Sequence, residues 1–333
     1  RDLRARSHRS RQAVVRCSLR LWGISFGFIR ALEHASDRSV STRFLVDAHV
    51  HLNNYHEATR RPTTENVQDL FDKMAECGVD HAVVITSYRV DLDRPSVEEI
   101  VDLLSADPRT TVVEGLRWRG DARTDLFHME ERIRDGRVKG IKLYPGYDKY
   151  AINDPSLEHV FNIAAKYDVP VMIHTGDTYS KEAKVRQSHP LLVDDIAVDF
   201  PKTKFVMCHL GNPWFQDTAE VLYKNDNVFA DISGLTLGEF SYQFERYISM
   251  RVREMITYMG DPGKQLLYGT DWPLVKMVPY LSFLDDLQLA NDKRENVCWG
   301  TAAKLFKLDE TTLEKGRALR LAIREPARRL MPT

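Results

Sequence analysis

Eight short runs rich in β-branched residues recur along the chain from Arg43 onward, and amphipathic stretches separate them. The centres of the runs lie about 30 residues apart, which is the length of a strand–helix–strand unit. Strands that alternate with helices predict a parallel sheet. The predicted strands are residues 43–52, 81–87, 110–116, 138–144, 169–176, 203–211, 227–234 and 265–273.

The stretches between these runs carry helix signals. The segment SLEHVFNIAAKYD places its apolar residues at helical spacing. Residues 96–107 begin with a capping box, in which Glu99 follows Ser96 by three positions. Residues 63–78 open on a threonine of the capping type and close on a glycine.

We expect an α/β protein whose main domain is a (β/α)8 TIM barrel over residues 44–308, because eight units of this length match that fold. An open, doubly wound sheet is the main alternative, and it would place a glycine-rich phosphate loop after the first strand. The chain has VDAHVHL at that point, which supplies His49 and His51 in place of glycines. The sequence therefore favours the barrel.

The two ends of the chain differ from the predicted barrel in composition. Residues 1–43 contain ten arginines, no lysine, seven serines and three acids. Such a composition can indicate an organelle transit peptide, and a flexible extension is the simpler alternative. In either case we expect this basic N-terminal extension to lie outside the barrel. Residues 309–333 carry six basic and four acidic side chains and predict a C-terminal helix or tail.

The overall composition narrows the range of functions. Lys plus Arg total 47 and Asp plus Glu total 48, so no excess charge favours a nucleic acid or an anionic membrane as partner. The four cysteines form no Cys-x-x-Cys pair, which indicates a reducing compartment such as the cytoplasm. No apolar run approaches the roughly 18 to 20 residues that span a bilayer. The composition therefore gives no support to a nucleic acid or a membrane as partner.

Polar side chains stand where the predicted strands end. In a (β/α)8 barrel, functional residues lie at the carboxyl ends of the strands, which all meet at one mouth. A single histidine at such a position is usually structural, but coincidence is a poor explanation for imidazoles and a carboxylate on four strands. The residues are His49 and His51 on the first strand, Lys142 on the fourth, His174 on the fifth, His209 on the sixth and Asp271 on the eighth.

The alternation of side chains along a strand extends this prediction to the barrel interior. Residues two apart point to the same face, so we expect Leu45 to face the interior together with His49. By the same rule we expect Met207 to face the interior together with His209.

Three imidazoles and a carboxylate suit a borderline divalent cation. Zn²⁺ is the first expectation, and Mn²⁺, Fe²⁺ or Co²⁺ would accept the same donors. Protein ligands that leave one position open for water make a catalytic site. The sequence leaves open whether one ion or two are bound.

Five segments, DAHVH, GIKLYP, VMIHTGD, CHLGNPW and YGTDWP, occur in this order across the predicted barrel. They resemble the amidohydrolase superfamily, and most closely its amidohydrolase-related branch. That branch includes pyrone-dicarboxylate lactonases and the aminocarboxymuconate-semialdehyde and resorcylate decarboxylases. The resemblance implies a second-metal ligand or a hydrogen-bond donor to substrate at His209. The metal ligands that it implies are His49, His51, His174 and Asp271.

The resemblance leaves three roles open for Lys142. In binuclear relatives a lysine on the fourth strand is carbamylated and bridges two metals. A free ammonium would instead hold a substrate carboxylate or carbonyl, and a structural ion pair is the third alternative. The surrounding Lys-Leu-Tyr-Pro sequence does not decide among them.

The predicted activity is hydrolysis of an amide, ester or lactone bond in a small, carboxylate-bearing substrate. A bound metal lowers the pKa of its water towards 7, and Asp271 is the expected general base. His209 and Lys142 would stabilise the oxyanion. Asp47 is expected either to orient a ligand imidazole or to bind backbone amides. Weaker candidates for substrate contacts are Tyr144, Arg117, Trp214 and Trp272.

Three other functions compete with hydrolysis. A decarboxylase of the same barrel family would use the same ligands but protonate a ring carbon. A deoxyribonuclease of the TatD type would carry a glutamate where this chain has Lys142, and the balanced charge gives phosphate binding little support. A non-catalytic barrel would not need the complete ligand set. Barrels of this branch often dimerise, so a homodimer is the oligomer that the resemblance suggests.

Overall fold

The structure is a computed structural model that describes residues 42–55, 60–91, 93–118, 122–236, 242–260 and 264–329. The predicted N-terminal extension lies outside these ranges except for its last two residues. From Thr42 onward the chain forms one compact unit. Within the described ranges, none of the helices has the length and apolar character required to cross a bilayer.

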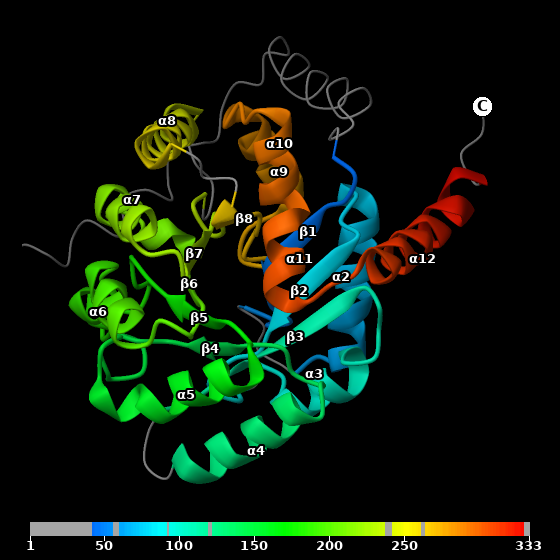
Figure 1. Ribbon diagram of the computed structural model, residues 1–333. Helices are drawn as coiled ribbons and strands as arrows, with labels where there is room; N and C mark the ends of the chain where they lie inside the picture. The colour runs from blue at the N-terminus through cyan, green and yellow to red at the C-terminus, as the bar shows by residue number, and fades with distance from the viewer. Residues whose placement is uncertain are drawn as a thin grey trace, which may run out of the picture. The chain divides into compact units, whose positions relative to one another are not determined.

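Eight parallel strands form one sheet in which each strand pairs with its neighbours in sequence order (Figure 1). Backbone hydrogen bonds join the first strand to the last: the N–H of Ala48 donates to the carbonyl of Tyr268, and that of Asp271 to the carbonyl of His49. The predicted (β/α)8 barrel is therefore confirmed. The strands are β1 (Val46–Val50), β2 (His81–Ile85), β3 (Thr110–Gly115), β4 (Ile141–Leu143), β5 (Val171–His174), β6 (Phe205–Cys208), β7 (Val228–Asp231) and β8 (Leu266–Leu267).

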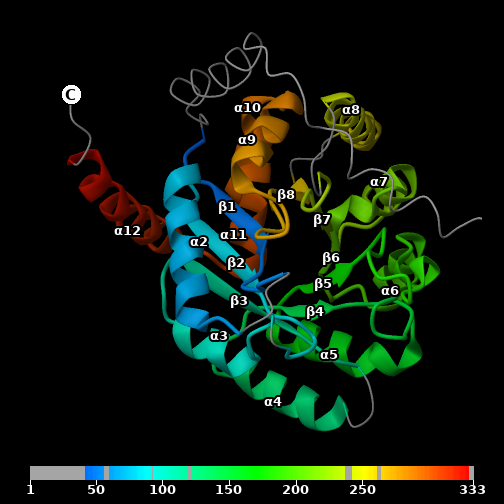
Figure 2. The same cartoon turned by 180° about the vertical axis from the view of Figure 1, so that it is seen from behind.

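Helices surround the strands when the molecule is seen from the front and from behind (Figures 1 and 2). The last helix, drawn in red, extends away from this ring. The helices are α2 (Thr63–Cys77), α3 (Val97–Leu104), α4 (Ala122–Arg134), α5 (Glu158–Tyr167), α6 (Leu191–Asp199), α7 (Phe215–Lys224), α8 (Tyr242–Met259), α9 (Met277–Asp286), α10 (Asn291–Glu295), α11 (Thr301–Phe306) and α12 (Glu310–Arg329), with a π-helix at Asn296–Gly300 and 3-10 turns at Pro155–Leu157, Val185–Ser188 and His209–Gly211.

The helix ends follow local sequence chemistry. The capping box predicted before α3 is confirmed, because Ser96 accepts from the N–H of Glu99 and the Glu99 carboxylate accepts from the N–H of Ser96. Helix α2 ends on Gly78, whose φ of 78° suits glycine. The predicted threonine cap of α2 is wrong, since Pro62 is the N-cap residue and no side chain caps that end.

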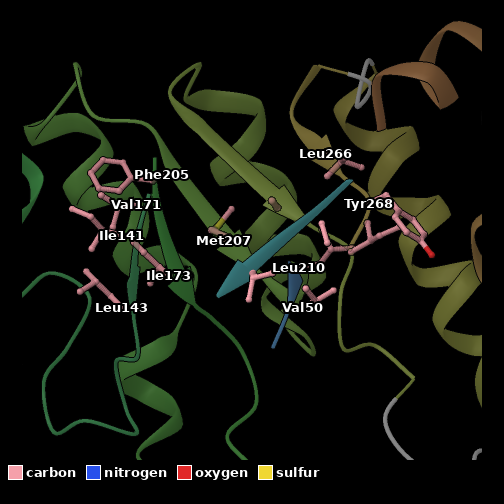
Figure 3. Packing of buried hydrophobic residues seen from close by; sticks show 14 of the residues in the cluster. Val50, Ile141, Leu143, Val171, Ile173, Phe205, Met207, Leu210, Leu266 and Tyr268 are labelled. Carbon is pink, nitrogen blue, oxygen red and sulfur yellow. The ribbon is translucent and has the colours of Figure 1, made fainter. Parts of the chain in front are cut away.

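Two hydrophobic cores lie on the two faces of the sheet. The larger one packs alternate strand residues against the covering helices, and Figure 3 shows part of it around Ile141, Val171 and Phe205. The second contains the strand residues of the opposite parity, such as Val83 and Val206, together with Phe306 and other residues of α11. It therefore fills the interior of the ring. Each of these buried side chains stabilises the fold by roughly 1.5–3 kcal/mol.

The predicted interior faces of β1 and β6 are wrong. Leu45 and Met207 belong to the core that packs against the helices, whereas Ala48 and Val206 face the interior. In β1 the pairing register with β2 shifts between Asp47 and Val50, which breaks the period of two. In β6 the strand ends one residue before His209.

Helix α12 is held against the barrel by ion pairs with a buried carboxylate. Asp80, which precedes β2, is 1% exposed and accepts hydrogen bonds from the guanidinium groups of Arg317 and Arg320. The N–H of Leu45 donates to the same carboxylate. This arrangement ties the start of β1, the α2–β2 loop and the last helix together.

Candidate active site

The carboxyl ends of β1 and β8 bring two imidazoles and a carboxylate together. Nε2 of His51 lies 3.3 Å from Oδ1 of Asp271, and Nε2 of His49 lies 3.7 Å from the same oxygen. One donor atom from each of the three residues lies within 4.8 Å of the others. All three residues are buried. Their donor atoms are close enough to share one cation.

Hydrogen bonds on the far side of each ring indicate which nitrogen carries the proton. Nδ1 of His51 lies 2.8 Å from the carbonyl oxygen of Ile85, which can only accept, so Nδ1 must donate. Nδ1 of His49 lies 2.8 Å from Oδ2 of Asp231, an acceptor as well. In both rings the lone pair is then on Nε2, the atom that faces Asp271. This is the arrangement that metal-binding histidines require.

The charges of these groups also suit a divalent cation. Burial lowers the pKa of His49 to about 4, although the neighbouring Asp231 opposes the shift. Burial alone would raise the pKa of Asp271, but His51, His49 and His209 lower it to about 2. Neutral imidazoles and an ionised carboxylate are the forms that bind a metal. The donor set therefore fits such an ion.

The backbone turns sharply at two of the strand ends. Asp271 has a φ of 69° and His209 a φ of 61°, values that residues other than glycine seldom adopt. Such conformations cost about 1–3 kcal/mol each and persist where the surrounding structure imposes them. Here they direct both side chains into the mouth of the barrel beside His49.

His174 lies near this cluster but does not join it. Its ring centroid is 5.1 Å from that of His209, and its Nε2 lies 2.9 Å from the carbonyl oxygen of Asp177. Within the described residues, neither compact group of metal-type donors includes His174 or His209. As the ring is oriented, only Nδ1 of His174 is free, and its role as a ligand stays a prediction.

His209 faces His49 across the site, with the two ring centroids 5.0 Å apart. Its Nδ1 lies 2.9 Å from Oγ and 3.2 Å from the carbonyl oxygen of Ser233. The carbonyl can only accept, so Nδ1 is protonated and Nε2 carries the lone pair. A neutral His209 in this orientation accepts a hydrogen bond through Nε2. The donor role that we predicted for His209 would need its protonated form.

Lys142 lies deeper, inside the barrel. Its side chain is almost fully buried, and its Nζ donates to Sγ of Cys208 at 2.7 Å. Cys208, His49 and Asp231 form the second compact group of metal-type donors in the described chain. Lys142 therefore supplies a positive charge below the imidazole cluster.

The four weaker candidates for substrate contacts occupy different surroundings. The hydroxyl of Tyr144 already donates to the carbonyl of Thr86, and the ring of Trp214 contacts that of His189 in a tilted arrangement. Arg117 is exposed to solvent. Trp272 lines a pocket of about 260 Å³, together with residues that follow β1 and residues of α2.

Asp47 does not orient an imidazole side chain. Its carboxylate accepts from the backbone N–H groups of His49 and Thr270 and from the Thr270 hydroxyl. Burial raises the pKa of Asp47 to about 7 against the effect of these hydrogen bonds. Of the two roles considered for Asp47, the structure shows the one in which it binds backbone amides.

Three residues near the site were missed by reasoning from the sequence. Asp231 and Ser233 at the end of β7 contact both His49 and His209. Both lie near the end of the predicted strand NVFADISG, so the rule that functional residues lie at the carboxyl ends of strands could have identified them. Arg94 lies in the loop after β2, where no motif marks it, and its guanidinium is 5.8 Å from the ring of Tyr55.

A closed parallel barrel with a buried histidine–aspartate cluster at its mouth defines the class of this protein: a TIM barrel with a candidate metal centre. The family model described as Amidohydrolase, Amidohydro_2, matches residues 46–308. The chain belongs to this amidohydrolase family. A search of curated protein sequences gives no significant match.

Solved structures share the fold. An uncharacterized TIM-barrel protein, Bb4693 from Bordetella bronchiseptica, has a TM-score of 0.63 at 17% identity, over 79% of this chain and 98% of that one. The 5-carboxyvanillate decarboxylase LigW from Sphingomonas paucimobilis has a TM-score of 0.57 at 14% identity, over 80% and 99%. A dihydroxybenzoic acid decarboxylase from Polaromonas sp. JS666, with bound manganese and the inhibitor 2-nitroresorcinol, has a TM-score of 0.55 at 12% identity, over 81% and 99%.

Proposed function

We propose that this protein is a metal-dependent hydrolase that cleaves an ester, lactone or amide bond in a small, carboxylate-bearing substrate. The observation that carries the proposal is the convergence of Nε2 of His49, Nε2 of His51 and Oδ1 of Asp271 on one point. His174 is the fourth proposed ligand, through a rotation of its ring. When bound there, Zn²⁺ or Mn²⁺ would supply an acidified water and a Lewis acid.

Asp271 is the proposed general base. Its carboxylate is ionised at neutral pH, so it can take a proton from water as the oxygen attacks the substrate carbonyl. The same carboxyl group then returns that proton to the leaving alcohol or amine. His209 would orient the substrate from the opposite side, with its free Nε2 accepting a hydrogen bond from a substrate hydroxyl or amide.

Lys142 is assigned a structural role in this account. Its Nζ is directed at Cys208, and its charge helps to keep the buried carboxylate of Asp231 ionised. A buried ammonium and a buried carboxylate that compensate each other avoid the large cost of an unpaired interior charge. Of the three roles considered for Lys142, this geometry favours a structural one, although the contact of Nζ is with Cys208 and not with a carboxylate.

Arg94 is the proposed binding group for the substrate carboxylate, in place of the exposed Arg117. Its guanidinium donates to Oγ of Ser87 at the end of β2 and lies 3.5 Å from Asp93. Its Nε is the buried atom that faces Asp93, and it makes an ion pair there without a hydrogen bond. Burial raises the pKa of Tyr55 well above its usual value, so this phenol beside Arg94 stays neutral at neutral pH.

Decarboxylation of an aromatic carboxylate is the second candidate function. It is favoured by two similar structures that are decarboxylases, of 5-carboxyvanillate and of dihydroxybenzoic acid. The same donor set would serve both reactions. In decarboxylation, Asp271 would have to deliver a proton to the ring carbon that loses CO₂, so it would have to enter the reaction protonated.

A substrate panel distinguishes the two reactions. Protein loaded with Zn²⁺ or Mn²⁺ is incubated with carboxylated lactones and esters while acid release is followed, and with hydroxylated benzoates while CO₂ is followed. The proposal expects acid release that disappears in Asp271→Asn. Release of CO₂ alone would replace hydrolysis by the second candidate, and no turnover of either series by metal-loaded protein would contradict both.

A further inference from the structure

The end of β7 holds a carboxylate that hydrogen-bonds to the imidazole of His49 and to the backbone N–H of His209. Asp231 is fully buried, and its Oδ2 lies 2.8 Å from Nδ1 of His49. Its Oδ1 accepts from the backbone N–H of His209 at 2.9 Å and from that of Ser233 at 3.1 Å. Each oxygen of this carboxylate is therefore committed to a different histidine.

The hydroxyl of Ser233 completes the arrangement. Its Oγ donates to Oδ1 of Asp231 at 2.5 Å, which leaves the oxygen lone pairs free to accept. Nδ1 of His209 lies 2.9 Å from this oxygen, and Nδ1 of His49 lies 3.0 Å from it. Every hydrogen bond in the set is satisfied only when both rings carry their proton on Nδ1.

We propose that Asp231 and Ser233 are a positioning pair that holds His49 and His209 in the same tautomer, with the Nε2 lone pairs of both rings directed into the site. This inference deepens the proposed function and rests on it for the identity of the site. Both residues are fully buried, so the pair acts through the two imidazoles.

Gly234 shows how tightly this arrangement is packed. A Cβ atom at Gly234 would lie 2.7 Å from Nδ1 of His209 and 3.2 Å from Oδ2 of Asp271. The backbone after Ser233 therefore passes directly against the ring that the pair orients. A rotation of His209 away from Ser233 would have little space.

The substitution Asp231→Asn should change the tautomer of His49. Three donors surround Oδ1, so the asparagine oxygen should take that position and place its NH₂ group opposite Nδ1 of His49. His49 would then have to accept at Nδ1 and carry its proton on Nε2. The lone pair that faces Asp271 would be lost, although the shape of the side chain is almost unchanged.

The direct test is the tautomer of each ring in the metal-free, full-length protein, measured by ¹⁵N NMR of the histidine side chains above about pH 7. Histidine-to-glutamine variants assign the signals. The proposal expects the Nδ1–H form for His49 and His209 in the wild type. It expects the Nε2–H form for His49 in Asp231→Asn, and a gain of the Nε2–H form for His209 alone in Ser233→Ala. The Nε2–H form for either ring in the wild type would overturn it.

Binding of Co²⁺ to the metal-free protein gives a second measurement. Asp231→Asn should weaken it by about 10–100-fold, the usual effect of removing the partner of a ligand histidine. Glu114→Gln is the matched control, since it neutralises a buried strand carboxylate that pairs with Arg132 on the outer face of the barrel. Unchanged affinity in Asp231→Asn, or an equal loss in Glu114→Gln, would contradict the proposal. If the wild type binds no Co²⁺, the proposed function fails, while the tautomers still decide this inference.

Discussion

Oδ1 of Asp271 lies 3.3 Å from Nε2 of His51, so the loop after β8 and the end of β1 meet at one pair of atoms. The contact depends on barrel closure, because the N–H of His51 donates to the carbonyl of Trp272 beside it. A carboxylate at this point can both bind a cation and take a proton.

Asp271→Asn should remove the base and retain the fold. The amide keeps the size of the side chain but cannot accept a proton, so we expect kcat to fall by about 10²–10⁴-fold. Steady-state kinetics with the substrate found in the panel measure the change. Asp194→Asn, which alters a partly buried carboxylate of α6 that pairs with Lys224 of α7, should retain wild-type kcat. An unchanged kcat in Asp271→Asn would remove this residue from the mechanism.

Gly234→Ala should disturb His209 most, and Asp271 less, because the new methyl group would lie 3.2 Å from Oδ2 of Asp271. The new methyl group would lie 2.7 Å from Nδ1 of His209, and the φ of 68° adds backbone strain. Since a displacement of about 1 Å can cost 10²-fold in rate, we expect a loss of that order in kcat/KM. Gly136→Ala is the control, because its φ of 74° is similar and no atom lies within 4 Å of its Cβ position. Equal activity in the two variants would argue against a role for His209.

The free energy of unfolding of the barrel should decrease as the pH is lowered, because of His81. Its Nδ1 donates to the carbonyl of Pro108 and its Nε2 accepts from Thr111, so only the neutral ring is fully bonded. Burial lowers its pKa from 6.5 to about 4. The unfolded chain then takes up a proton that the folded chain resists, so stability present above pH 6.5 is lost between that pH and about 4.

The size of this effect is at most about 3 kcal/mol. Chemical denaturation at a series of pH values measures it, with His81→Gln for comparison. The difference in unfolding free energy between the two proteins should shrink as the pH falls through this window. A difference that stays constant would exclude His81 as the titrating group.

Much of the fold was predictable because its signals are local. Each strand is a short apolar run between turn-forming residues, and period and spacing were enough to order β1 to β8. His49, His51 and Asp271 followed from the rule that the carboxyl ends of parallel strands meet. The orientation of side chains was harder to predict, because a register shift in β1 and a positive φ at His209 break the alternation on which it depends.

The hydrogen bonds that orient the histidine rings of the site could not be predicted from the sequence. Asp231 and His49 are 182 positions apart, and their contact exists only once the barrel has formed. The sequence shows that both residues end strands, but not which nitrogen of the ring faces which oxygen. The same holds for Arg94, whose loop carries no pattern.

Phe306→Ala should weaken the interior of the barrel. Phe306 is 1% exposed and packs with the inward-facing residues of the strands. Replacing a buried phenylalanine by alanine typically costs about 3–5 kcal/mol, through lost contacts and the cavity that remains. Thermal or urea unfolding measures the loss. Phe127→Ala on the surface of α4, where 58% of the residue is exposed, should change stability by less than about 0.5 kcal/mol. Similar losses in both would contradict this packing.

The central claim is that His49, His51 and Asp271 hold one divalent cation at the mouth of the barrel. The most direct measurement is the anomalous scattering of a crystal of the protein grown with Mn²⁺. The account predicts one strong peak about 2.0–2.3 Å from Nε2 of His49, Nε2 of His51 and a carboxylate oxygen of Asp271. A crystal that contains Mn²⁺ but shows no peak at these three atoms would contradict it.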